Sequence, residues 1–424
     1  MKPLPLISAL CITFAVAVNP AFAAQPLQVT FHANKSAADF TQPGTFFEGA
    51  ILNKQGNGIT FGTSIGTLNY TDPFGYGTHS YSYDRWTSSW FATGFGFGEL
   101  VSSWNADTPA GTWVQVEMQA TTNGIYQTKW YVMGRWAFGD GDFHRTSVGG
   151  QGDNDGYVAI DTFFAKDHPM IAYRLRVTFF RLPNQKAAPT LYKVGAFASN
   201  MPNANPYEPS PLGGAEGVEL AVPRFSQEIH SGEYPQFDGG GEAWCSPTST
   251  SMVLAFWGVG PSPSDYAYVY NDYPNVVDPW VDYAARYVFD YHYQGAGNWP
   301  FNNAYGAHFG LDTEVTQLRS LYEAEQFIKA GVPIVASIAF DPNKLDGFLF
   351  RSTAGHLLTI IGFTASGDVI SNDPASTSDD TVRHVYDRAQ FEKAWMKSTG
   401  GVVYIMHPSS VPLPPPTDPG QPNW

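Results

Sequence analysis

The sequence predicts a multi-domain protein in which an N-terminal all-β sandwich, jelly-roll-like in arrangement, precedes an α+β domain. Apolar and polar residues alternate up to about residue 200, and turn residues rather than helical patterns separate the runs. A Pro-rich stretch at 200–211 follows, and beyond it helical and strand patterns occur together. We place the β-sandwich at 24–200, a linker at 201–218, the α+β domain at 219–408 and an extended, flexible Pro-rich tail at 409–424.

The composition excludes several classes of function. The chain has 23 Lys+Arg and 38 Asp+Glu, a net charge of −15 (23 − 38), whereas binding of nucleic acid or anionic lipid needs clustered positive charge. Hydrophobic residues make up 43% and charged residues 14%, which is typical of a chain that buries a core. Two cysteines exclude a disulfide framework and a cysteine-built zinc site. We therefore expect no nucleic-acid partner, no metal ion and no cofactor.

Residues 1–23 have the pattern of a removable signal peptide. Lys2 precedes an apolar stretch at 6–18, and residues 21–23 form a small-x-small cleavage site. The apolar stretch is too short to span a bilayer. We therefore expect a secreted protein, extracellular or periplasmic, with no membrane span in its mature form. After cleavage one cysteine remains, Cys245.

The strands of the first domain are expected where the alternation is clearest, at 112–118, 130–136 and 172–180. Clusters of Gly, Asn and Asp at 139–142 and 149–156 separate such runs. These clusters lack the spacing and the closing Glu of an EF-hand, so we expect turns rather than calcium loops. Strands joined by turns predict antiparallel sheets.

The second domain combines both kinds of element. The pattern predicts helices at 248–257 and 324–330, and strands at 334–340, 356–363 and 368–371.

Cys245 lies where a nucleophile would be expected. A glycine-rich loop at 239–241 leads into it and an apolar helix pattern follows. Pro247 is tolerated only in a first helical turn, so Cys245 is predicted at the N-terminus of the helix. There the helix dipole and the free N–H groups favour a thiolate. A small buried hydrophobe is the alternative, and this segment alone does not decide between the two.

Strand pairing predicts that His356 and Asp373 are neighbours. If the hairpin closes around residues 365–366, paired residue numbers sum to 731 and His356 lies opposite residue 375. Asp373 is then its diagonal neighbour on the same face, within reach of its side chain, and Asn372 points to the opposite face. A single bulge would invert this choice.

Cys245, His356 and Asp373 have the residue types that thiol catalysis requires. A thiolate nucleophile needs an imidazole that later protonates the leaving amine, and the imidazole needs an acceptor that holds its tautomer. In this interpretation Cys245 attacks an amide, His356 is the general base and acid, and Asp373 orients His356. The expected reaction is amide hydrolysis through an acyl-enzyme.

The residues of the second domain resemble the bacterial C39-like cysteine peptidases, which have a papain-like fold. The resemblance covers about 219–408 and leaves the first domain outside it. It rests on four segments, namely Val222-Pro223-Arg224-Phe225-Ser226-Gln227, Trp244-Cys245-Ser246-Pro247-Thr248-Ser249, Gly355-His356 and Asn372-Asp373-Pro374.

The resemblance implies a cysteine peptidase acting on a protein or peptide substrate, with Cys245, His356 and Asp373 in the roles given above. It also implies a glutamine side chain that stabilises the oxyanion beside the backbone N–H of Cys245. Gln227 matches this donor best because it follows Val222-Pro223, and Gln236, closer to Cys245, is a rival. Ser246 stands where many relatives carry Gly.

Two alternatives stay open. A cell-wall amidase or a transglutaminase-like acyltransferase would use the same triad. A carbohydrate- or wall-binding protein with an inactive peptidase-like domain would use aromatic rings of the first domain to stack on cell-wall glycan, although aromatics at such density are more often core. The candidate rings are Trp86, Trp90, Phe91, Phe95 and Phe97.

Overall fold

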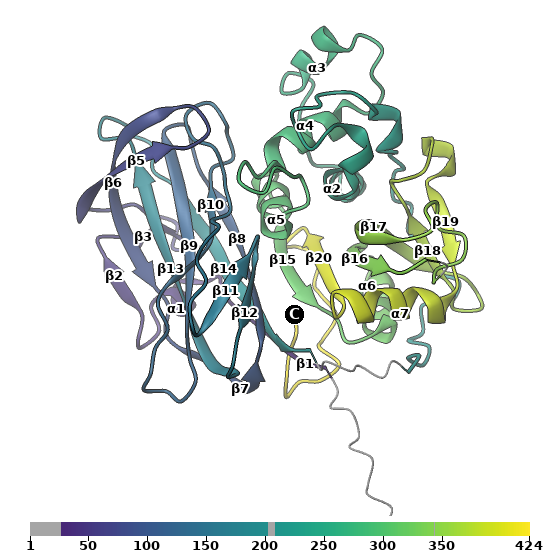
Figure 1. The fold of residues 1–424 in the computed structure, drawn as a ribbon, viewed down its shortest axis with the longest axis horizontal. Helices are drawn as coiled ribbons and strands as arrows, with labels where there is room; N and C mark the ends of the chain where they lie inside the picture. Colours follow the sequence, from purple (N-terminus) through teal and green to yellow (C-terminus); the bar gives the residue numbers. More distant parts are fainter. Residues whose placement is uncertain (1–26, 202–207, 343) are drawn as a thin grey trace, which may run out of the picture.

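Alternating apolar residues build two antiparallel sheets in the N-terminal region of the computed structural model, which describes residues 27–201, 208–342 and 344–424 (Figure 1). Sheet A has the order β11 (Gly156–Ala159), β12 (Thr162–Ala165), β8 (Glu99–Asp107), β14 (Thr190–Asn200), β4 (Ile59–Thr60) and β3 (Ile51–Leu52), with β1 (Gln28–Asn34) also paired to β14. Sheet B has the order β10 (Tyr131–Trp136), β9 (Thr112–Thr121), β13 (Met170–Arg181), β6 (Gly77–Thr87) and β2 (Phe46–Glu48), with β5 (Gly66–Asp72) on β6 and β7 (Phe91–Phe97) on β13.

Sheets A and B enclose a common core. Side chains from both sheets belong to one buried hydrophobic cluster, and the hydroxyl of Tyr173 in β13 donates to the carbonyl of Ala196 in β14 at 2.9 Å. Three of the five aromatic residues considered for glycan stacking, Trp86, Phe95 and Phe97, are buried in this core. These three rings therefore stabilise the fold and offer no exposed surface to a sugar.

The C-terminal region is built around sheet C, with the order β15 (Asp312–Gln317), β20 (Val402–His407), β16 (Ile334–Phe340), β17 (Thr353–Phe363), β18 (Val369–Asn372) and β19 (Arg383–Tyr386). Its pairs are antiparallel. The α-helices in the described part of the chain are α1 (Ala37–Phe40), α2 (Cys245–Phe256), α3 (Ala267–Asp272), α4 (Pro279–Val288), α5 (Trp299–His308), α6 (Leu321–Lys329) and α7 (Arg388–Ser398).

The N- and C-terminal regions are joined by a buried interface. The ring of Phe301 in α5 contacts Trp104 and Trp136, with ring centroids 6.2 and 5.3 Å apart. The buried ammonium group of Lys193 in β14 lies 2.6 Å from a carboxylate oxygen of Asp312 and of Glu314 in β15. Residues from both regions form one continuous hydrophobic cluster. Such an apolar interface holds the two regions in one arrangement.

The expectation of a flexible tail is wrong. The chain end folds back between the N-terminal sheets and α6, where Asn423 is buried and its amide donates to the carbonyl of Gln317 and to Glu323, at 2.8 and 2.9 Å. The Trp424 ring packs against Phe327 with centroids 5.0 Å apart. The side chains of these terminal residues hold the tail in place through buried contacts. The Pro-rich start of the tail, on which the prediction was based, gives no sign of these contacts.

The predicted signal peptide at 1–23 and part of the linker, residues 202–207, lie outside the described residues. Among the residues that are described, there is no helix with the length and apolar character needed to cross a membrane.

Candidate active site

Cys245 is the first residue of α2 and is partly exposed at the N-terminus of that helix. In the preceding loop, Gly240 begins a short 3-10 turn (Gly241–Ala243), and its φ of +111° strongly favours glycine. The buried indole of Trp244 then anchors the loop by donating to the carbonyl of Phe237 at 2.6 Å. Ser246 follows in the first helical turn and its hydroxyl pairs with that of Tyr404 at 2.9 Å. The free N–H groups at this helix end favour negative charge on sulfur and on a nearby oxygen.

His356 and Asp373 are in direct contact. Nε2 of His356, in β17, lies 2.8 Å from Oδ1 of Asp373, which follows β18 directly, and both residues are buried. Oδ1 also accepts the backbone N–H of Ala375 at 3.1 Å, and Oδ2 accepts the hydroxyl of Tyr386 at 2.7 Å. Three donors therefore hold the carboxylate in place.

The ring of His356 also interacts with the side chain of Cys245, and both residues line the same cavity. Because Nε2 is bonded to Asp373, Nδ1 is the nitrogen available to the thiol. Burial alone would lower the pKa of His356, but the charge and hydrogen bond of Asp373 and the interaction with Cys245 raise it to about 10. Burial would raise the pKa of Asp373, and the interaction with His356 holds it below its ordinary value. The arrangement favours a protonated imidazole that lies between the carboxylate of Asp373 and the sulfur of Cys245.

Gln227 reaches the same site and Gln236 does not. Gln227 is buried and lines the cavity that Cys245 and His356 also line. Its Nε2 donates to the carbonyl of Glu242 at 2.7 Å and to Glu228 Oε1 at 3.2 Å. Gln236 is exposed and lines a different cavity. Of the two glutamines, Gln227 lines the cavity that contains Cys245, and Gln236 does not.

The segment before Gln227 is held by the residues that flank Asp373. The buried amide of Asn372 donates to the carbonyls of Val222 and Pro223, at 3.2 and 3.0 Å. The backbone N–H of Gln227 donates to the carbonyl of Pro374 at 2.8 Å. The Asn372-Asp373-Pro374 turn therefore has two contacts at the site. It holds the segment that carries Gln227, and through Asp373 it also holds the ring of His356.

The cavity at Cys245 has a volume of about 630 Å³ and is lined by both halves of the molecule. The C-terminal region contributes Cys245, His356 and Gln227, and the N-terminal region contributes residues of the β11–β12 hairpin. The hairpin, Tyr386 and Glu228 were not identified from the sequence. Their sequence distance from Cys245 gives no signal, because only tertiary packing brings them to the site.

Comparison with protein families assigns both regions of the chain. The model of the Peptidase C39-like family matches residues 219–403, and the model of the Peptidase C39 N-terminal domain matches residues 30–199. Together they account for most of the chain. The chain belongs to the C39-like peptidase family.

No match was found among curated proteins. Among solved structures, the chain is similar to the Clostridium thermocellum N-terminal endo-1,4-beta-D-xylanase 10B, in a structure of its CBM22-1–GH10 modules complexed with xylohexaose. The identity is 12%, the TM-score is 0.20, and the match covers 46% of this chain and 33% of that one. The C39-like protein therefore spans about a third of the length of that structure.

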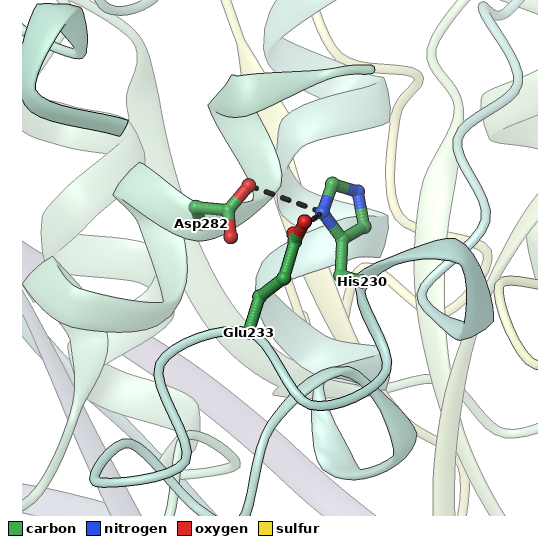
Figure 2. A group of neighbouring side chains, drawn as sticks. All are labelled: His230, Glu233 and Asp282. Atoms are coloured by element: carbon green, nitrogen blue, oxygen red, sulfur yellow. Dashed lines mark hydrogen bonds and ion pairs between the residues drawn. The ribbon is translucent and has the colours of Figure 1, made fainter. Parts of the chain in front are cut away.

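The charged side chains of His230, Glu233 and Asp282 form a largely buried group in this C39-like protein (Figure 2). Nδ1 of His230 is 2.8 Å from Glu233 Oε2 and 3.0 Å from Asp282 Oδ2. Burial alone would lower the pKa of His230, but its bonds to the two carboxylates raise it to about 9. The three ligand atoms lie within 4.8 Å of one another and would suit a divalent cation. His230 would first have to lose the proton that its two carboxylates stabilise.

We predict that His230 makes the free energy of unfolding depend on pH. Its pKa in the folded protein, about 9, exceeds the ordinary value of 6.5. The stabilisation is therefore fully present below pH 6.5 and lost as the pH rises through 9. Urea unfolding should show wild type more stable than His230→Gln at pH 6, with the difference about 3 kcal/mol smaller at pH 10. A difference that does not change with pH would contradict a protonated His230.

Proposed function

We propose that this protein is a secreted cysteine peptidase that hydrolyses peptide bonds through an acyl-enzyme on Cys245. The observation that carries the proposal is the contact of the His356 ring with Asp373 on one side and Cys245 on the other. This contact lies in a cavity large enough for part of a peptide chain. Membership of the C39-like peptidase family supports a protein or peptide substrate.

In the first half of the reaction, Sγ of Cys245 attacks the carbonyl carbon and the π electrons move to the carbonyl oxygen. The backbone N–H of Cys245 and Nε2 of Gln227 donate to this oxyanion, and Gln227 exchanges its bond to Glu228 for the new acceptor. The C–N bond then breaks as His356 gives its Nδ1 proton to the leaving amine. The products are a free amine, a thioester on Cys245 and a neutral His356.

In the second half, water replaces the amine. His356 takes a proton from water while the oxygen attacks the thioester carbon. Cleavage of the C–S bond releases the carboxylic acid and restores the thiolate and imidazolium. Asp373 holds the ring through both halves, so that Nδ1 stays directed at Cys245.

A papain-like arrangement of the C-terminal region is part of this proposal. In support, α2 carries the nucleophile and packs against β17, which carries His356, with the Ser249 hydroxyl donating to the carbonyl of Leu357 at 3.2 Å. Secretion rests on the signal-peptide pattern at 1–23. Burial of Trp86, Phe95 and Phe97 leaves cell-wall glycan binding with less support than peptide hydrolysis.

The experiment that tests the proposal is alkylation of Cys245 by iodoacetamide between pH 4 and 9. An ordinary cysteine becomes reactive only as it loses its proton near pH ~8.5. We expect fast alkylation below pH 7 in wild type, because the imidazolium of His356 stabilises the thiolate. In His356→Ala the fast reaction should collapse. Slow alkylation that rises only near pH 8.5 and ignores His356 would refute the catalytic assignment.

A further inference from the structure

The β11–β12 hairpin brings the N-terminal region into the cavity of Cys245 and His356. In Figure 1 the hairpin lies on the side of the N-terminal sheets that faces the C-terminal region. We propose that Ile160, at the tip of this hairpin, is a specificity-determining residue that contacts an apolar side chain of the substrate beside the scissile bond. The proposal rests on the peptidase function proposed above.

The hairpin is fixed to the C-terminal region through Asp161. Oδ2 of this buried carboxylate accepts the backbone N–H of Trp299, the first residue of α5, at 2.8 Å. Oδ1 accepts the hydroxyl of Thr162 at 3.0 Å. A carboxylate at a helix N-terminus is held by both the free N–H groups and the helix dipole. The hairpin tip is therefore part of the rigid wall of the cavity.

A second interdomain contact supports the same placement. The backbone N–H of Ser147 donates to Asp290 Oδ1 at 2.9 Å, and the same oxygen accepts the N–H of His292 at 3.0 Å. Asp290 Oδ2 accepts the side-chain amide of Asn298 at 2.9 Å, and Asn298 caps α5. The N-terminal region is therefore hydrogen-bonded to both ends of the loop that leads into α5, at Asp290 and at Trp299.

Ile160 has a backbone conformation that isoleucine rarely adopts. Ala159 pairs with Thr162, so Ile160 and Asp161 form a two-residue turn, and φ of Ile160 is +58°. Glycine or asparagine is the usual residue in this conformation, and a β-branched side chain is disfavoured. Ile160 is 37% exposed and lines the cavity. Strain kept at a residue that lines a reaction cavity indicates a functional contact.

The cavity around Ile160 suits an apolar side chain. Its wall includes Trp299, Phe350 and Leu357 as well as Ile160. The carboxylate of Asp161 is already bonded to backbone and hydroxyl donors, so it offers little to a charged ligand. An apolar substrate side chain placed here would be removed from water against these groups.

The test compares wild type with Ile160→Gly in the full-length protein. Glycine adopts the required φ without strain, so the variant should keep the turn and fold. Ile160→Asn also tolerates the conformation and puts a polar group at the same place. Ile125→Gly is the matched control, because Ile125 is an exposed isoleucine that does not line this cavity.

Each variant is incubated with a peptide library from a proteome digest, and the cleavage sites are read by mass spectrometry. Wild type should prefer Leu, Ile, Phe or Met over Ala and Asn at one position within three residues of the cleaved bond. In Ile160→Gly and Ile160→Asn that preference should fall about tenfold, as for loss of apolar contact in a specificity pocket. Ile125→Gly should keep the wild-type preference.

The outcomes separate the two proposals. Cleavage with no apolar preference, or with a preference unchanged in Ile160→Gly, overturns the role of Ile160 and leaves the peptidase intact. If wild type cleaves no peptide although His356-dependent alkylation of Cys245 is observed, the role of Ile160 toward peptides is wrong while the catalytic centre stands. Absence of both activities refutes the peptidase function and the inference together.

Discussion

Replacement of Cys245 by serine lowers kcat/KM on a peptide substrate by about 10⁴-fold or more, because a hydroxyl keeps its proton at neutral pH and is a poor nucleophile beside an imidazolium. Removal of one triad member in related chemistry costs up to about 10⁶-fold, since the members act as a unit. Steady-state kinetics of wild type, Cys245→Ser and Cys245→Ala measures the effect. The alanine variant should lose at least as much activity as the serine variant.

The serine variant should fold normally. Cys245 is partly exposed at the start of α2, and serine differs from cysteine by one atom. Thermal unfolding should shift by no more than a few degrees. Ser246→Ala, one residue further along the same turn, removes a buried hydroxyl that pairs with Tyr404 and should affect stability more than turnover. If Cys245→Ser kept more than 1% of wild-type kcat/KM, the nucleophile would lie elsewhere.

The proximity of His356 and Asp373 was predicted from a strand register. This register is correct for the pairs next to Asp373 and wrong for the pairs next to the turn. Near the turn the expected sum of 731 is wrong, because Phe363 pairs with Val369. A bulge between Ile360 and Gly362 then shifts the register, and Thr359 pairs with Asn372 as expected. The longer turn and the bulge compensate each other. Neither leaves a clear signal in the sequence, since the turn residues fit both lengths.

Helices were harder to predict than strands. The strand expected at 334–340 matches β16 residue for residue, because every residue of this short run except Ser337 is apolar. Helices α3, α4 and α5 were not predicted, since they are rich in Tyr, Trp, Asn and Pro, which have low helix propensity. Helices α4 and α5 pack against α2, α5 also packs against β8, and α3 packs against α4. This tertiary packing outweighs propensity.

The sequence indicated which residues carry the chemistry of the site, but not which residues line the cavity around them. Cys245, His356 and Gln227 carry local motifs, whereas Tyr386 and Ile160 reach the site only through contacts between distant segments. Two domains joined by a linker were predicted, yet the buried contacts of Lys193 and Phe301 make the N-terminal region part of the same rigid body. Contacts of this kind are set by shape complementarity, which hydrophobic patterning does not encode.

Replacement of Asp373 should have the second large effect on activity. Two variants of this residue distinguish the contribution of its hydrogen bond from that of its charge. In Asp373→Ala, His356 loses the acceptor at Nε2 and its ring is free to turn away from Cys245. We expect kcat/KM to fall about 10²- to 10³-fold, less than for loss of the nucleophile, because thiol and imidazole remain. Steady-state kinetics beside wild type measures this loss.

Asp373→Asn is the matched control, since its carbonyl oxygen can still accept the N–H groups of His356 and Ala375. The negative charge that helps to raise the pKa of His356 to about 10 is then absent, so this pKa should fall. Activity needs the imidazolium, and is lost as the pH rises through the pKa of His356. The alkaline limb of kcat/KM should therefore move to lower pH by one unit or more in Asp373→Asn, with near-wild-type activity at pH 6. An alkaline limb that stays in place would mean that the hydrogen bond alone, and not the charge of Asp373, sets the protonation of His356.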